Sequence, residues 1–169
     1  MANGQKQDWY LDPFTYVMNF LPATASVTTN GSFTVQADSA FCLVSTTLIV
    51  SDTSDAAVAN LVPFGNSSTS LLPFLITLSD SGAGRDLMDG AVAVDNLFGT
   101  GQRPYLWPFK KVFAPNSTVT ARLQNLSATD RRVRLAFNGD ILFAYNSQFM
   151  NALMHSVVST PLVIQAPPS

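Results

Sequence analysis

The residues that could carry out chemistry are few in this sequence. His155 is the only histidine and Cys42 the only cysteine. A hydrolytic triad would have to use His155, yet its neighbours include no acidic residue, and the chain contains no Gly-x-Ser-x-Gly motif. A zinc site needs three or four Cys, His or carboxylate ligands, so one cysteine and one histidine argue against it. We therefore predict that the protein is not an enzyme, has no catalytic residues and uses no cofactor.

Three aspartates surround a glycine-containing turn. Asp80 precedes Ser81-Gly82-Ala83-Gly84, and Asp86 and Asp89 follow it. Such clusters can hold Ca²⁺, but this spacing departs from the Asp-x-Asp-x-Asp-Gly loop and lacks a bidentate Glu. A turn that uses Asp and Gly for its backbone geometry is favoured, and no metal site is predicted. Paired aspartates for glycoside cleavage stay an open alternative.

A segment rich in aromatic residues and proline, 105–113, carries the main choice between two roles. Its aromatic side chains could form an interaction hot spot, or they could plug one end of the folded core. A second aromatic pair stands near the N-terminus, where a docked arm would place it. The residues predicted for an interface are Trp9, Tyr10, Tyr105, Trp107 and Phe109.

Alternating apolar and polar residues predict the strands that must position these side chains. The clearest alternation lies in 118–124 and 132–137, where Val133 and Phe137 are predicted to point inward and Arg132 and Arg134 outward. Asn138-Gly139 predicts a hairpin turn after the second of these strands. The other predicted strands are 14–21, 32–38, 41–50, 71–78, 140–145 and 161–165. The strand 32–38 follows a predicted Asn30-Gly31 turn, and 41–50 is predicted to be more fully buried, together with the Cys42 thiol. Loops are predicted at 51–70 and 85–116, and a short helix at 147–156.

The composition also favours strands over helices. The chain has no Glu, and its only lysines are Lys6, Lys110 and Lys111, whereas Val, Thr, Phe, Pro and Gly are abundant. We predict an all-β fold, an antiparallel β-sandwich with the jelly roll as one topology, and a barrel stays open. Residues 1–12 are predicted to form an extended N-terminal arm ahead of a single domain over 13–169.

Charge is scarce along the whole chain. Apolar residues make up 47% of it and charged residues 12%, with a net charge of −2. An ordinary soluble domain is roughly 25% charged, so we expect other subunits to cover part of the surface. The net negative charge provides no positive field that would attract nucleic acid. No apolar run approaches the ~20 residues that a membrane-spanning helix needs. The residues after Met1 do not resemble the apolar core of a signal peptide. We expect a protein made in the cytoplasm that binds neither nucleic acid nor membrane.

The order of several motifs resembles a family of small β-structured virion proteins of tailed bacteriophages, over roughly residues 12–145. The motifs are Asp38-Ser39-Ala40-Phe41, Phe74-Leu75-Ile76-Thr77-Leu78-Ser79-Asp80, Gly84-Arg85-Asp86-Leu87, Leu97-Phe98-Gly99, Arg103-Pro104, Ala114-Pro115-Asn116-Ser117, Leu123-Gln124-Asn125-Leu126-Ser127 and Val133-Arg134-Leu135-Ala136-Phe137-Asn138-Gly139. The resemblance implies a structural protein of the virion that stabilises or decorates the capsid, or an accessory protein of the neck or collar. It implies major capsid or head–neck proteins as partners and carries over no catalytic residues. Together with the low charge, it leads us to expect a homo-oligomer, for example a trimer.

One alternative comes from a different class of function. A carbohydrate-binding β-sandwich would use Trp107 and Tyr105 as stacking platforms and aspartates for sugar hydroxyls. A small hydrolase is disfavoured because the usual acid–base residues are missing. Association with assembled virions separates the structural role from the carbohydrate-binding one.

Overall fold

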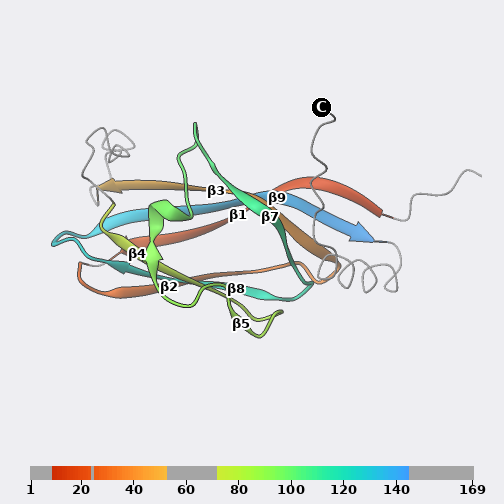
Figure 1. The fold of residues 1–169 in the computed structure, drawn as a ribbon, viewed down its shortest axis with the longest axis horizontal. Helices are drawn as coiled ribbons and strands as arrows, with labels where there is room; N and C mark the ends of the chain where they lie inside the picture. Colours follow the sequence, from red (N-terminus) through yellow and green to blue (C-terminus); the bar gives the residue numbers. More distant parts are fainter. Residues whose placement is uncertain (1–8, 24, 53–71, 145–169) are drawn as a thin grey trace, which may run out of the picture.

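The computed structural model describes residues 9–23, 25–52 and 72–144, which form two β-sheets packed face to face (Figure 1). All of the strand pairs within the two sheets are antiparallel. Sheet A contains, in spatial order, β1 (Trp9–Ala23), β9 (Arg131–Ala144), β3 (Ser39–Asp52) and β7 (Tyr105–Phe113). Sheet B contains β2 (Thr28–Thr34), β8 (Thr118–Asn125), β4 (Phe74–Asp80) and β5 (Arg85–Asp86), with β6 (Val92–Ala93) also paired to β4 and the short 3-10 helix η2 (Val94–Asn96) after it.

This strand order is that of a jelly roll. From β1 to β4 the chain changes sheet at every connection, and it does so again from β7 to β9, so neighbours in sequence face each other across the core. The all-β sandwich predicted from the sequence is confirmed, and the sheets end in open outer strands instead of closing into a barrel. The predicted set of three antiparallel strands over 118–145 is wrong, because β8 and β9 lie in different sheets.

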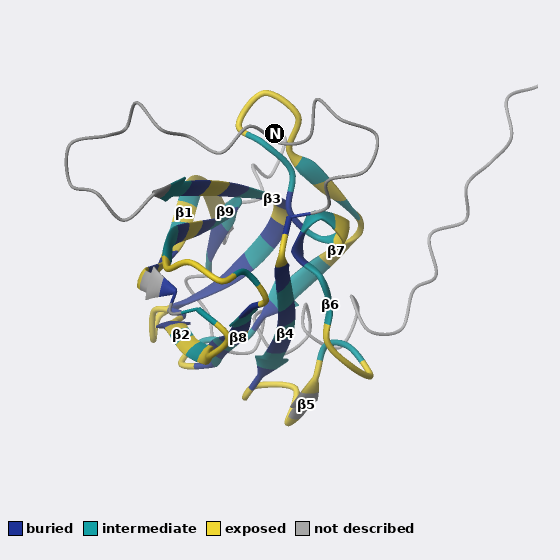
Figure 2. Cartoon of the chain, turned by 90° about the vertical axis from the view of Figure 1, so that its left-hand side faces the viewer, coloured by how far each residue is buried: buried dark blue, intermediate teal, exposed yellow. Residues whose placement is uncertain are grey.

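The core lies between the two sheets, and buried and exposed positions alternate along the strands (Figure 2). Val119, Ala121 and Leu123 of β8 are fully buried, as the alternation predicts. On β9, Val133 and Phe137 are buried while Arg134 is exposed, as predicted, and Arg132 is half-buried. Large aromatic rings fill the centre, among them Phe33, Phe41, Phe98, Phe113 and Phe137.

Neither of the two Asn-Gly pairs forms the turn that the sequence predicts. Asn30-Gly31 lies inside β2, and Asn138-Gly139 lies inside the continuous strand β9. Both glycines are required by close approach: a Cβ at Gly31 would come within 2.8 Å of the Phe20 ring, and one at Gly139 would collide with the carbonyl oxygen of Cys42. Opposite Gly139, strand β3 carries one extra residue in a β-bulge.

Two strands also continue through prolines, so their predicted limits are wrong. Residues 9–12, predicted as part of an arm, belong to β1, which continues through Pro13. Strand β7 contains Pro108 and lies where irregular structure was predicted. Both are outer strands of sheet A, where a residue without an N–H group can be accommodated because no further strand needs its hydrogen bond.

The remaining predictions divide into confirmed and undescribed segments. The strand at 71–78 is found as β4, and the Asp80–Gly84 turn follows it, with Gly84 at φ 62° and the Asp80 carboxylate accepting a hydrogen bond from the Gly82 N–H. The strand at 41–50 is found within β3, but Val44 and Ile49 are exposed, so one of its faces is not buried. The segments 1–8, 53–71 and 145–169, with the predicted helix, last strand and His155, lie outside the described residues.

Candidate functional site

The aromatic segment of β7 is divided between the core and the surface. Trp107 is half-buried against the core, and its indole N–H donates to Thr46 Oγ1 at 3.3 Å. Tyr105 packs edge-on against Trp107, with ring centroids 6.0 Å apart. Phe109, by contrast, is 73% exposed, and the neighbouring Leu106 is 65% exposed. One part of the segment therefore seals the core and the other part faces outward.

A distortion of β7 explains why these side chains diverge. Leu106 pairs with Ser45 and Lys111 with Leu43, so four residues of β7 lie opposite the single residue Val44 of β3. The unpaired stretch bulges from the edge of the sheet and carries Phe109 with it. Pro108 within the stretch has no N–H group with which to extend the ladder.

The predicted interface residues do not come together in one patch. Trp9 and Tyr10 begin β1, whereas Tyr105, Trp107 and Phe109 belong to β7, and these strands form opposite edges of sheet A. The Tyr10 ring stacks on Phe143 of β9 with centroids 4.7 Å apart, so this part of β1 contacts its own subunit.

The outward side of sheet A, here called the sheet A face, carries an unusual number of large apolar side chains. On outer strand β1 they are Leu11, Val17 and Leu21, and Leu21 is 55% exposed. Ala40 and Leu142, at one end of this face, are buried. The solvent-exposed part of the face therefore extends along the strands from the level of Asp140 on β9 to the level of Leu21 on β1. The exposed apolar residues of the face are Leu11, Val17, Leu21, Val44, Ile49 and Leu106.

The polar groups of the sheet A face are few. The Arg134 Nε–H donates to Asn19 Oδ1 at 2.9 Å, and the Thr15 hydroxyl donates to Asn138 Oδ1 at 3.0 Å. Arg132, Arg134 and Asp140 lie on the outward side of β9, the last two six residues apart, and no ion pair joins Arg134 or Asp140 to another described residue.

Cys42 lies beside Asp140 on the sheet A face. Burial raises the pKa of the Cys42 thiol; the nearby Lys110 ammonium lowers it and the Asp140 carboxylate raises it further. The half-buried thiol is therefore a poor nucleophile at neutral pH, because the thiolate is the reactive form.

The outward side of sheet B, here called the sheet B face, has a different chemistry. Its side chains are mainly hydroxyls and amides, and Arg122 is the one charged group among the outward positions of β2, β8 and β4. Thr34 and Thr118 share a hydrogen bond across strands at 3.1 Å. The face consists of Thr28, Asn30, Ser32, Thr34, Leu75, Thr77, Ser79, Thr118, Thr120, Arg122 and Gln124.

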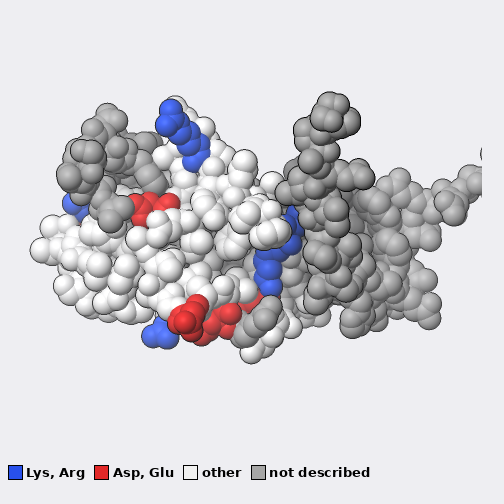
Figure 3. Space-filling view, viewed as in Figure 1, with Lys and Arg blue, Asp and Glu red and all other residues white. Residues whose placement is uncertain are grey.

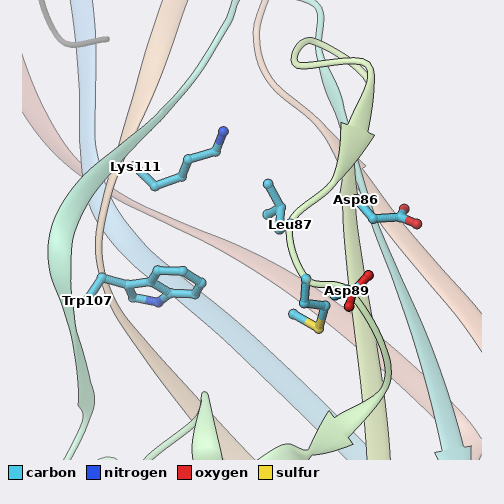
Figure 4. A pocket seen from close by; sticks show the side chains of 6 residues that line it. Asp86, Leu87, Asp89, Trp107 and Lys111 are labelled. Atoms are coloured by element: carbon cyan, nitrogen blue, oxygen red, sulfur yellow. The ribbon is translucent and has the colours of Figure 1, made fainter. Parts of the chain in front are cut away.

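A groove of about 600 Å³ opens where the edges of the two sheets meet, between β7 and the segment after β5. Trp107 and Lys111 form one wall; the Leu87 side chain points toward them, whereas the Asp86 carboxylate points away from Trp107 (Figure 4). The groove is lined by Asp86, Leu87, Met88, Asp89, Trp107 and Lys111.

An ion pair joins the two sheets beside this groove. Lys111 Nζ of β7 lies 3.1 Å from Asp80 Oδ2 of β4, and the Asp80 side chain is only 3% exposed. Lys111 also lies over the Phe113 ring, 5.2 Å from its centroid. The Asp80 carboxylate therefore stabilises the fold, because it pairs with Lys111 and accepts a hydrogen bond from the Gly82 N–H.

Charged side chains are sparse on the side of the molecule seen in Figure 3, and most of the described surface there is uncharged. Within residues 9–23, 25–52 and 72–144, no three Cys, His, Asp or Glu side chains lie close enough to hold a metal ion. No helix in this part of the chain has the length and apolar character that a membrane crossing requires.

The sequence interpretation missed two parts of this surface. The apolar sheet A face includes Val17 and Ile49, which the alternation of their strands with buried neighbours could have placed outward. The groove joins Trp107 to Leu87 and Met88, residues about twenty positions away, and no local pattern in the sequence marks that contact. No family model and no curated protein sequence matches the chain.

Proposed function

We propose that the protein is a structural subunit of a tailed-bacteriophage particle that stabilises or decorates the capsid through protein–protein contacts. The observation that carries this proposal is the sheet A face, on which residues such as Val17, Leu21 and Ile49 are left exposed in a chain with 12% charged residues. Exposed apolar patches of this kind mark interaction surfaces.

The fold and the motif order support the proposal from two other directions. Jelly rolls occur in viral capsid proteins, and also in lectins, so the topology is compatible with the role without selecting it. The motif order over residues 12–145 selects the virion protein, because it resembles that family. Its place is on the head, bound to the major capsid protein, with a neck or collar accessory protein as the alternative.

The bulged edge of β7 is the best candidate for the contact with the particle. Phe109 and Leu106 are the two most exposed large apolar residues in the described part of the chain, and they lie together on an outer strand. Aromatic side chains at such positions commonly dominate the binding energy of an interface.

Particle occupancy tests this function. Virions that carry the wild-type chain, a Phe109→Asp variant or a Ser32→Asp variant are purified, and the bound copies are quantified by mass spectrometry. We expect full occupancy for wild type and Ser32→Asp, and at least a tenfold loss for Phe109→Asp. A wild-type chain that never co-purifies with virions would overturn the structural role.

A second candidate function is carbohydrate binding at the groove. It is favoured by the fixed Trp107 ring, which a hydrogen bond to Thr46 and the edge of Tyr105 hold in place beside Asp89. Such a ring can stack on a sugar while a carboxylate accepts hydrogen bonds from hydroxyl groups. Titration with host lipopolysaccharide and with maltoheptaose, followed by tryptophan fluorescence, tests it. Saturable quenching that is lost in Trp107→Ala would support this function, and no quenching would exclude it for these glycans.

A further inference from the structure

The charges on the sheet A face are arranged so that the face complements a second copy of itself. Arg134 and Asp140 stand on the same side of β9, six residues apart, which is about 20 Å along a strand. A two-fold axis in the plane of the contact, perpendicular to β9 and level with Phe137, exchanges these two positions. Each copy then places its Arg134 opposite Asp140 of the other copy.

The apolar residues follow the same symmetry. The axis brings Ile49 of one copy over Cys42 of the other, Ala136 over Asn138, and Val17 over Thr15, as the strand register requires. Leu21 of one copy approaches Leu11 of the other at the margin. Ile49 and Val17 thus meet small or weakly polar groups, and Arg134 meets Asp140, while Leu21 meets Leu11 and Arg132 of one copy lies opposite Leu142 of the other.

The area available suits a stable but modest dimer. The open part of the face, from Asp140 to Leu21, spans four strands and covers about 600 Å² per copy at ordinary strand spacing. A contact of about 1,200 Å² in total lies at the lower end of specific protein–protein interfaces.

We infer that the sheet A face binds a second copy of this chain in a two-fold dimer held by reciprocal Arg134–Asp140 ion pairs. The inference rests on the proposed function in taking the chain as a subunit of an assembly, and it names the contact between copies. The inferred contact is two-fold, and the trimer expected from the sequence stays an untested prediction. The contact includes Leu106 of β7 and leaves Phe109, on the bulge of the same strand, for the particle.

Sedimentation velocity of the full chain, at concentrations up to about 200 µM, tests the pairing. Wild type is expected to dimerise. Arg134→Asp and Asp140→Arg each place like charges opposite each other twice, so each should weaken dimerisation at least tenfold. An equimolar mixture of these two variants should associate again, because every contact in the mixed dimer joins opposite charges. The matched control is Arg122→Asp on the sheet B face, which should dimerise like wild type.

The outcomes separate this inference from the proposed function. A wild-type chain that stays monomeric at the highest concentration, or single variants that fail to associate on mixing although circular dichroism shows them folded, would overturn the dimer. Particle occupancy of Arg134→Asp is then measured beside wild type. Normal occupancy of a monomeric variant leaves the virion role standing, whereas a dimer that never reaches virions leaves the interface standing without that role.

Discussion

The outer faces of the two sheets differ in chemistry although their inner faces are alike. Both sheets contribute fully buried aliphatic and aromatic residues to one core, such as Phe137 from sheet A and Leu123 from sheet B. Outward, sheet A exposes Val17, Leu21 and Ile49, whereas the outward positions of sheet B are mainly hydroxyls and amides. The fold requires the inner pattern, so the outer difference reflects what each face contacts. This difference is the one that the proposed contact between copies through sheet A requires.

The largest expected effect tests whether the inner faces are in fact equivalent. Phe137→Ala should lower the free energy of unfolding by about 3–5 kcal/mol and Leu123→Ala by about 2–5 kcal/mol, because each leaves a cavity at a fully buried site. Urea unfolding followed by circular dichroism measures both. A loss below about 1 kcal/mol for either variant would show that its sheet contributes less to the core than the burial indicates.

The next effect concerns the edge where the two sheets are joined. Lys111→Met removes the partner of Asp80, whose side chain is 3% exposed, and should cost about 2–3 kcal/mol in the free energy of unfolding. The cost should fall short of that for a fully buried pair, because the Lys111 side chain is 25% exposed. Asp80→Asn combined with Lys111→Met should recover most of the loss in the same urea experiment. Equal stability of Lys111→Met and wild type would show that the ion pair does not hold this edge.

A matched pair of substitutions compares the two outer faces directly. Val17 and Ser32 both lie outward on outer strands, one in each sheet. Val17→Lys should weaken dimerisation about tenfold, or ~1.4 kcal/mol, while Ser32→Lys leaves it unchanged. Both variants should unfold within about 0.5 kcal/mol of wild type, since neither side chain is in the core. Equal weakening of dimerisation by the two variants would remove the distinction between the faces.

The smallest effect uses Cys42 as a reporter on the sheet A face. Because burial raises the pKa of its thiol, the thiolate forms only at higher pH than in a free cysteine. Maleimide labelling near pH 8 should therefore be a few times slower than for a free cysteine and should speed up as the pH rises. Dimerisation should slow it further at high protein concentration. Labelling at the rate of free cysteine, independent of concentration, would place this thiol in open solvent.

The sequence predicts the fold class well because alternation is a local signal. In the segments from Val119 to Leu123 and from Val133 to Phe137, the apolar residues face the core, as the alternation of apolar and polar residues predicts. The two Asn-Gly pairs fail for a non-local reason: Gly31 and Gly139 make room for a ring or a strand that lies far away in the sequence. Nothing within a few residues of either glycine distinguishes that requirement from a turn.

The interface residues could be predicted only in part, for a similar reason. The sequence singles out the aromatic segment, but its division into an inward Trp107 and an outward Phe109 depends on a bulge set by pairing with β3. The apolar residues of the sheet A face were invisible as a set, because Val17, Val44 and Ile49 come from separate strands that only the topology places on one surface.

The prolines at the two edges of sheet A have a consequence for how copies of this chain can accumulate. A long outer strand with free N–H and C=O groups can recruit another strand, and a protein packed at high local concentration would then polymerise into fibres. Pro13 on β1, and Pro108 with Lys110 on β7, interrupt that ladder at both edges. These interruptions disfavour growth by strand addition at either edge, so we expect the proposed contacts between copies to form through side chains.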